Sequence, residues 1–404
     1  MKCRFCKSKL STEFVDLINQ PPSNSYVLRE QLNEPEVYYP LKIFVCSKCK
    51  LVQIDEYKKS NDIFDNEYAY FSSYSSSWLD HSKNYVSYMI EKLSLNNASK
   101  VTEIASNDGY LLQFFKEKNI PCLGIEPTKN TAAVAREKGI DVIEDFFGST
   151  LAKTIEPSDL ILGKNVLAHV PDINDFVQGL KIALKPKGTI TMEFPHLLNL
   201  IQKNQFDTIY HEHFSYLSFY TAKEIFEHHG LKLYDVEKFP THGGSIRIFA
   251  THEESSIKVS KNVENLINEE RSFGICDEEI YQGFQQKTDR VKNDLLTFLL
   301  QSKIENKSVI AYGAAAKGNT LLNYAGVKSD LISFVVDKSP HKQGKYLPAS
   351  HIPIVSEENI TKLKPSYVLI LPWNIQDEVT EQLKYIRKWG GKFVVAVPEL
   401  KIFE

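Results

Sequence analysis

The chain has 404 residues, of which 42% are hydrophobic and 25% are charged, and its formal net charge is −3. This length suffices for two or three domains with cores of their own, and the composition is that of a globular protein. The small net charge gives no electrostatic reason to expect nucleic acid or an anionic membrane as a partner. The sequence contains no run of about 18 apolar residues, so we expect no transmembrane helix. The first residues lack the apolar segment of a secretory signal, so we expect a cytoplasmic protein.

Two CxxC pairs lie near the N-terminus, and they contain four of the six cysteines: Cys3 with Cys6, and Cys46 with Cys49. Each CxxC turn directs two sulfurs toward one point, so two such turns can surround a tetrahedral ion. Four thiolates leave no open coordination position, which predicts a structural Zn²⁺ in a domain over residues 1–65. The segments 41–46 and 51–54 are typical of a hairpin around the second pair. Reduced cysteines in ordinary loops, or a redox pair, are the alternatives.

Strands and helices alternate after a helix predicted over 79–93. The expected strands are 101–105, 122–126, 141–146, 159–170 (a strand running into a loop), 189–195 and a hairpin over 231–250. Strands separated by helices indicate a doubly wound, mostly parallel α/β sheet. We therefore predict a second domain over 66–255 and a polar helical connector over 256–306. A second Rossmann-like unit is predicted over 307–404, with strands at 308–313, 331–337, 366–371 and 392–397.

The turn after the first strand of the second domain lies in VTEIASNDGYLLQF, which resembles motif I of class I S-adenosylmethionine methyltransferases. Its small residues let the backbone approach a cofactor, although the usual first glycine is Ala105 here. Glu126 ends the second strand, where a carboxylate accepts both ribose hydroxyls. An NAD-binding unit has an acid at the same place, but GxGxxG is absent; NAD-dependent oxidoreduction and a non-binding domain remain the alternatives.

Eight residues are predicted to bind S-adenosylmethionine: Glu103, Ala105, Asn107, Gly109, Glu126, Asp145, Phe146 and Asn165. Asp145 would bond the adenine amino group and the Phe146 ring would stack on the base. Asn165 follows a strand, at the point where the sheet opens toward the methyl donor.

The segment FDTIYHEHFSYLS (206–218) places four proton-handling side chains in a row, Tyr210 to His213. Methylation of carbon requires a base for a C–H beside a carbonyl and donors for the developing oxyanion. His213 suits the base because imidazole titrates near neutrality. Glu212 would orient it or bind a hydroxyl, Tyr210 would donate to the oxyanion, and His169 would reach the same space.

Two other interpretations of this segment stay open. The histidines could pack at a sheet edge. A second metal site is the other alternative, because alternating histidines on a strand face one way, but no third ligand is evident nearby.

The C-terminal unit opens with the small-residue turn AYGAAAKGN (311–319) before a helix. Backbone N–H groups at a helix N-terminus suit a diphosphate, and Lys317 lies beside them. Asp337 ends the next strand, as a ribose-binding acid would. We expect Gly313, Lys317, Asn319 and Asp337 to bind a nucleotide-linked substrate; NAD binding and a structural duplicate are the alternatives.

Together the motifs resemble the sugar C-methyltransferases that act on nucleotide-linked keto-deoxysugars, such as the dTDP-sugar 3-C-methyltransferases of the mycarose and tetronitrose pathways. The resemblance spans nearly the whole chain. It is carried by CRFC, CSKC, YAYFSSYSSSW, EIASNDGYLL, GIEP, NVLAHVPDINDF, EFPHL, FDTIYHEHFSYLS, HGGSIR and GAAAKGN.

This resemblance implies three domains: an N-terminal zinc-binding one, a middle S-adenosylmethionine-binding one and a C-terminal Rossmann-like one. The sugar nucleotide would lie between the last two, with Arg247 of HGGSIR among its ligands. His213 would remove the proton beside the C4 ketone. The supporting active-site groups would be Tyr210, Glu212, His169 and Tyr70, with Tyr68 and Tyr74 as rivals of the last.

The sequence thus predicts a monomeric S-adenosylmethionine-dependent C-methyltransferase. Its small-molecule substrate would be a nucleoside-diphosphate 4-keto-6-deoxysugar, methylated at C3 through an enolate. A sugar O-methyltransferase, and a nucleotide-sugar-binding protein without catalysis, are the alternatives.

Overall fold

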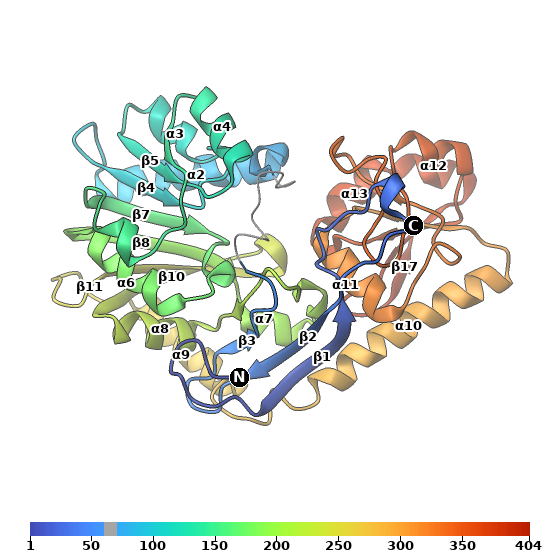
Figure 1. Ribbon diagram of the computed structural model, residues 1–404, viewed down its shortest axis with the longest axis horizontal. Helices are drawn as coiled ribbons and strands as arrows, with labels where there is room; N and C mark the ends of the chain where they lie inside the picture. The colour runs from blue at the N-terminus through green and yellow to red at the C-terminus, as the bar shows by residue number, and fades with distance from the viewer. Residues whose placement is uncertain (60–70) are drawn as a thin grey trace.

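The computed structural model describes residues 1–59 and 71–404, and their strands form three sheets (Figure 1). The first is a four-stranded antiparallel sheet whose order is β1-β2-β3-β9. Its strands are β1 (Thr12–Gln20), β2 (Tyr39–Val45), β3 (Val52–Ile54) and β9 (Ser215–Tyr216). The predicted hairpin of β2 and β3 is confirmed. The fourth strand comes from the middle of the chain and starts two residues after His213, so this sheet joins the cysteine-bearing N-terminus to the histidine segment.

The second sheet has seven strands in the order β10-β11-β8-β7-β4-β5-β6. The strands are β4 (Val101–Ile104), β5 (Cys122–Ile125), β6 (Asp141–Ile143), β7 (Ser158–Lys164), β8 (Leu184–Pro195), β10 (Leu231–Phe239) and β11 (Ser245–His252). The five strands from β8 to β6 run parallel, and the β10–β11 hairpin adds antiparallel to β8. All four residues of β4 are buried, as expected for a strand covered on both faces. The predicted doubly wound sheet is confirmed.

The helices of this unit are α2 (Ser76–Leu93), α3 (Leu112–Glu117), α4 (Lys129–Glu137), α5 (Ser149–Ala152), α6 (Ile173–Ala183), α7 (Leu197–Gln202) and α8 (Phe219–His228). Short 3₁₀ turns are η1 (Arg29–Gln31), η2 (Ser72–Tyr74), η3 (Leu167–His169), η4 (Phe206–Thr208), η5 (Thr241–Gly243), η6 (Trp373–Ile375) and η7 (Lys384–Trp389).

The polar connector consists of α9 (Lys261–Phe273) and α10 (Phe284–Ile304). It leads to a six-stranded sheet in the order β14-β13-β12-β15-β16-β17. The strands are β12 (Val309–Tyr312), β13 (Val335–Val336), β14 (Ile354–Val355), β15 (Tyr367–Ile370), β16 (Lys392–Val395) and β17 (Lys401–Phe403), and the helices are α11 (Ala316–Ala325), α12 (Glu358–Leu363) and α13 (Gln376–Gln382). Only β17 is antiparallel. In the described part of the chain, no helix combines the length and apolarity that crossing a bilayer requires.

One apolar core joins the N-terminal sheet, α10 and the C-terminal sheet. Phe14 of β1 stacks on Phe284 of α10 with ring centroids 4.4 Å apart, and both rings are nearly fully buried. In Figure 1, β1 and β2 run beneath the space between the two α/β units. Truncating Phe14 to alanine would cost about 3–5 kcal/mol of stability, so this contact fixes the path of the N-terminal strands between the units.

Candidate active site

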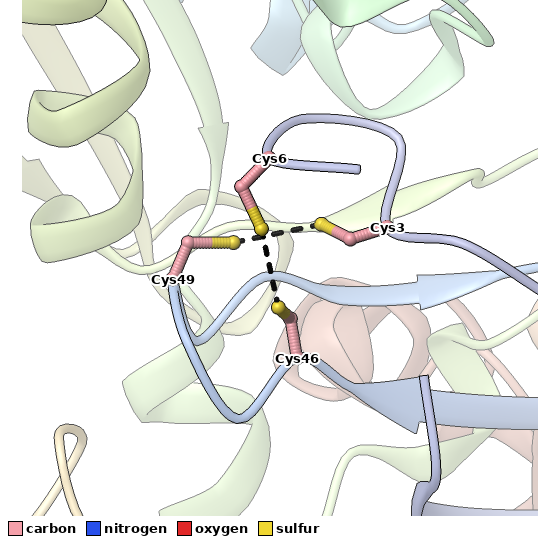
Figure 2. A group of neighbouring side chains, drawn as sticks. All are labelled: Cys3, Cys6, Cys46 and Cys49. Carbon is pink, nitrogen blue, oxygen red and sulfur yellow. Dashed lines mark hydrogen bonds between the residues drawn. The ribbon is translucent and has the colours of Figure 1, made fainter. Parts of the chain in front are cut away.

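The four cysteines of the N-terminal pairs meet at one point (Figure 2). Their sulfurs all lie within 4.8 Å of one another, and the Cys3–Cys49 and Cys6–Cys46 sulfurs are 3.5 Å apart. Zn–S bonds of about 2.3 Å require sulfur–sulfur edges of about 3.8 Å. The hydrogen bond with Cys49 lowers the pKa of the Cys3 thiol, and Gln53 donates to the same sulfur. This donor set fits a closed, structural zinc ion.

A cavity of about 440 Å³ opens at the carboxyl ends of β4, β5 and β7, the edge at which doubly wound sheets bind ligands. Six of the eight predicted cofactor residues line it: Ala105, Asn107, Glu126, Asp145, Phe146 and Asn165. Three of them, Ala105, Asn107 and Asn165, have left-handed backbone with φ of 56°, 49° and 55°. Such strained residues concentrate at binding sites, which supports this cavity as the cofactor pocket.

The Glu126 carboxylate accepts hydrogen bonds from two backbone N–H groups, one of them in the cofactor turn. Its Oε2 accepts the Asn107 N–H at 2.8 Å and its Oε1 accepts the Thr128 N–H at 2.9 Å. Burial raises the pKa of this carboxyl, which is only 5% exposed. At the same cavity, the Asn165 Oδ1 is buried without a hydrogen-bond partner. A carboxylate and an orphaned amide oxygen both accept hydrogen bonds, so this edge of the cavity suits a ligand with hydroxyl or ammonium donors.

The other two predicted cofactor residues support the turn from beneath. Glu103 is fully buried, and burial raises its pKa well above the usual value while the charge of Lys164 works in the opposite direction. Gly109 has φ +72°, and a Cβ there would lie 2.4 Å from Ile140 Cδ1. Glycine is therefore needed for the close packing of the turn on α4 rather than for contact with a ligand.

Beside the cofactor cavity, His169 and His213 form an imidazole pair with ring centroids 4.6 Å apart. His213 Nδ1 lies 3.0 Å from the Thr208 carbonyl oxygen, and His169 Nδ1 lies 2.8 Å from the Glu212 carbonyl oxygen. A carbonyl only accepts, so each Nδ1 carries the proton and each Nε2 keeps a lone pair. Burial lowers the pKa of His213 well below its usual value and that of His169 to about 4. Both rings are therefore neutral and able to accept a proton.

His211 and His213 do not share one face, as the metal-site alternative would require. Residues 210–213 form a turn instead of a strand, closed by a 3.0 Å bond from His213 N–H to the Tyr210 carbonyl. The His213 ring lies over Tyr210, with centroids 4.0 Å apart, whereas His211 packs against Tyr39 of β2. Among the described residues, the cysteine cluster is the only group of three or more candidate metal ligands, so a second metal site at HEH has no support.

Glu212 points toward the N-terminal domain. Its Oε1 accepts the Asn24 side-chain amide at 2.8 Å, and the residue is 5% exposed. Burial raises the pKa of this carboxyl to about 7, while the Asn24 hydrogen bond and the charge of Lys58 work in the opposite direction. The predicted Tyr70 and its rival Tyr68 lie outside the described residues.

The residues predicted to bind substrate in the C-terminal unit occupy structural contacts around its first turn. The Asp337 Oδ2 accepts the Ala314 N–H at 2.8 Å, as Glu126 does in the cofactor unit. Gly313 has φ +89°, and a Cβ there would lie 2.5 Å from Pro372. Asn319 is 1% exposed and donates to the Ser23 carbonyl at 2.6 Å.

Lys317 extends from the same turn toward the histidine cluster. Its ammonium lies over the Trp373 ring, 4.7 Å from the centroid, and donates to Asn374 at 2.6 Å. Burial, opposed by the charge of Asp207, lowers the pKa of Lys317. The Lys317 charge is in turn a minor contributor to the lowered pKa of His213.

Arg247, predicted to bind substrate, lies in a buried ion network on β11. Its guanidinium donates to Glu193 at 2.7 and 3.1 Å and to Glu237 at 3.1 Å. Glu193 also contacts His81 at 2.7 Å and Lys164 at 3.5 Å. Burial alone would raise the pKa of Glu193, but these hydrogen bonds and charges outweigh it and lower the pKa. The guanidinium of Arg247 is thus directed into this network and not into the cavity.

His242, which precedes the two glycines of HGGSIR, was not among the predicted site residues. His242 has φ +53°, its Nε2 lies 3.1 Å from the Asn165 amide nitrogen, and its ring packs edge to face on Trp78. Gly243 has φ +88°, with the Trp373 ring 2.4 Å from where a Cβ would be. The two consecutive glycines could have indicated this site, because they permit the close approach between the two α/β units.

Three protein-family models match the chain: a zinc binding domain over residues 3–64, a methyltransferase domain over 80–236 and a C-methyltransferase C-terminal domain over 240–398. The chain is 33% identical over 405 residues to C-methyltransferase NovU of Streptomyces niveus. This match covers 99% of this chain and 96% of NovU. It is 26% identical over 150 residues to the ubiquinone biosynthesis O-methyltransferase of Actinobacillus pleuropneumoniae serotype 5b (strain L20), covering 32% of this chain and 64% of that protein.

Two solved methyltransferase structures are similar to part of this chain. Magnesium protoporphyrin IX methyltransferase (ChlM) of Synechocystis PCC 6803 with bound SAH is 13% identical, has a TM-score of 0.36 and covers 43% of this chain and 83% of its own. A SAM-dependent methyltransferase of Archaeoglobus fulgidus is 15% identical, has a TM-score of 0.37 and covers 43% and 93%. With NovU matched from end to end and all three family models in order, the chain belongs to the S-adenosylmethionine-dependent C-methyltransferase family with an N-terminal zinc-binding domain.

Proposed function

We propose that this C-methyltransferase acts on a nucleoside-diphosphate 4-keto-6-deoxysugar and methylates C3 through an enolate, with His213 as the base. The observation that carries the proposal is the tautomer of His213. Its Nδ1–H is held by the Thr208 carbonyl, so the Nε2 lone pair is available, and the neighbouring His169 lines the cofactor cavity. Methylation of carbon requires a base close to the methyl donor. His213 meets this requirement because it packs on His169, which lines the cofactor cavity.

The neighbours of His213 suit an enolate mechanism. Removal of the C3 proton leaves negative charge on the C4 oxygen; the Tyr210 hydroxyl, on the ring packed against His213, and the Lys317 ammonium would stabilise it. When bound, S-adenosylmethionine supplies an electrophilic methyl group, to which C3 forms its new bond as the methyl–sulfur bond breaks. Glu212 accepts a hydrogen bond from a sugar hydroxyl and so fixes the ring beside His213.

A nucleoside diphosphate is proposed because the C-terminal unit is a second Rossmann-like fold, whose first strand is followed by a small-residue turn and a helix. Helix α11 begins at Ala316, and its first N–H groups and Lys317 lie on the side of this unit that meets the histidine cluster. Sugar and nucleotide would then bridge the two units. Cytoplasmic location and a monomeric state stay predictions.

The proposal is tested by two measurements on the purified enzyme. With a labelled methyl donor and candidate keto sugars, the carbon spectrum of the product should show a methyl group on carbon; a methyl on oxygen would establish the O-methyltransferase alternative. In D₂O with S-adenosylhomocysteine in place of the methyl donor, the wild-type enzyme should exchange the C3 proton of the sugar. An enzyme that binds the nucleotide sugar but neither exchanges nor methylates it would be the non-catalytic binding protein.

A further inference from the structure

A segment of the zinc-binding domain enters the space between the two α/β units. After β1 ends at Gln20, residues 21–27 pass beside the C-terminal unit, and Figure 1 shows the N-terminal strands leading to this space. The Ser23 carbonyl accepts the Asn319 amide at 2.6 Å. The Tyr26 hydroxyl donates to the Ala314 carbonyl at 2.6 Å. Val27 forms an isolated antiparallel bridge with Tyr346.

These three contacts, all with the C-terminal unit, lie on both sides of Asn24. Its side chain turns the other way and donates to Glu212 Oε1 at 2.8 Å, across 188 positions of the sequence. The carboxylate only accepts hydrogen bonds, so the Asn24 NH₂ group faces it, and the Asn24 Oδ1 lies 3.4 Å from the Tyr26 hydroxyl. One residue of the N-terminal domain thus contacts the active-site segment while the C-terminal unit holds the backbone around it.

We propose that Asn24 is a positioning residue for the Glu212 carboxylate, so that the zinc-binding domain completes the active site. This inference rests on the proposed function, in which the Glu212 carboxylate accepts a hydroxyl of the substrate. Asn24 bonds one oxygen of the carboxylate and restricts its rotation. The other oxygen would accept the hydroxyl of the sugar.

The contact also governs the ionisation of Glu212. Burial raises the pKa of this carboxyl to about 7, and the Asn24 hydrogen bond opposes that shift because it stabilises the charged form. Among the described residues, three titratable groups from other elements face Glu212. Lys58 follows β3 and favours the carboxylate, Tyr26 shares the segment of Asn24, and His169 donates to the Glu212 backbone carbonyl. On the segment of Glu212 itself, Tyr210 and His213 complete the set.

The test compares Asn24→Ala and Asn24→Asp with the wild-type enzyme. Asn33→Ala, at an exposed position in the same domain, is the control. In Asn24→Ala the acid limb of the kcat/KM profile should move upward by about one pH unit, since a hydrogen bond to a charged group is lost. Asn24→Asp keeps the shape of the side chain but sets two carboxyls together, so the limb should move further. At high pH, the kcat/KM of Asn24→Ala should return to within about threefold of wild type. Asn33→Ala should match wild type at every pH.

A second measurement separates this inference from the proposed function. In protein labelled with ¹³C at the glutamate carboxyls, the resonance that disappears in Glu212→Gln can be titrated without any substrate. If wild type methylates no keto sugar but this resonance titrates higher in Asn24→Ala, the positioning contact stands and the proposed function fails. If wild type is active while both the resonance and the acid limb are unchanged in Asn24→Ala, or if activity falls equally at all pH values, the inference is overturned.

Discussion

The imidazole rings of His169 and His213 lie edge to face with centroids 4.6 Å apart, and each holds its Nδ1 proton on a backbone carbonyl. Both imidazoles are therefore neutral, with the proton on Nδ1, and His169 lines the cofactor cavity while His213 packs against His169. Backbone acceptors fix both tautomers, because a carbonyl can neither donate nor rotate away as a side chain could.

Replacing His213 by asparagine should lower turnover by about 10²–10⁴-fold, because the general base is lost. Binding of S-adenosylmethionine, measured by calorimetry, should be unchanged, since His213 does not line the cofactor cavity. His228→Asn is the matched control at an exposed position. Normal turnover in His213→Asn would refute the assignment of the base.

The pH profile of Glu212→Gln should lack an acid limb near pH 7. In the wild-type enzyme, kcat/KM should fall as the pH drops through about 7, where the Glu212 carboxylate takes up a proton. The histidines do not titrate there, because burial lowers the pKa of His169 to about 4 and that of His213 well below its usual value. The Gln variant should be slower but flat through this range. A limb that persists near pH 7 would assign it to another group.

Replacing Glu126 by glutamine should weaken S-adenosylmethionine binding by about 10–100-fold, because charged hydrogen bonds to ribose hydroxyls and to the cofactor turn are lost. Calorimetry measures the effect directly. Glu137→Gln, on the exposed face of α4, should bind the cofactor as wild type does. Equal affinities of the two variants would remove Glu126 from the cofactor site.

Elemental analysis should find one zinc per chain, and Cys46→Ser should abolish it. Structural zinc contributes folding free energy directly, so a chelator should lower the unfolding temperature of the enzyme. Cys276→Ser should keep the metal and the stability, since this thiol lies outside the cluster. Zinc retained at full stoichiometry in Cys46→Ser would contradict a four-cysteine site.

Asp207→Asn should stabilise the fold at pH 8 and have little effect at pH 4. Burial raises the pKa of Asp207 from 3.8 to about 6. A folded-state pKa above the unfolded one means that the carboxyl costs stability as the pH rises from about 4 to 6, by up to about 3 kcal/mol in full. The Asn oxygen can still accept the Trp373 indole N–H, which is 2.7 Å from Asp207. Urea unfolding at the two pH values measures the difference; a destabilised variant at pH 8 would show that the attraction of Lys317 for this carboxylate dominates.

The sequence predicted both α/β sheets because their strands and helices alternate with clear apolar runs. It did not predict β1, where Phe14 and Val15 are both buried and Ile18 has φ +59°. Register irregularities between Glu13 and Val15, and between Asp16 and Asn19, interrupt the two-residue alternation on which strand recognition depends.

The candidate site was predictable only where its chemistry is local. The cysteine pairs and the turn with Glu126 have their signal within a few residues. The opposite directions of His211 and His213 arise from a turn that the sequence pattern did not indicate. Asn24 lies 188 positions from Glu212, and no local pattern marks such a contact.

Strand β9 starts two residues after His213 and pairs with β3, the strand that follows the second cysteine pair in the chain. The N-terminal zinc-binding domain is therefore part of the same sheet as the segment that contains His213. A chimera that exchanges the first 59 residues with those of a relative would have to bring along a matching stretch around residues 206–218. Without it, the foreign module would dock out of register and displace the imidazole that the chemistry depends on.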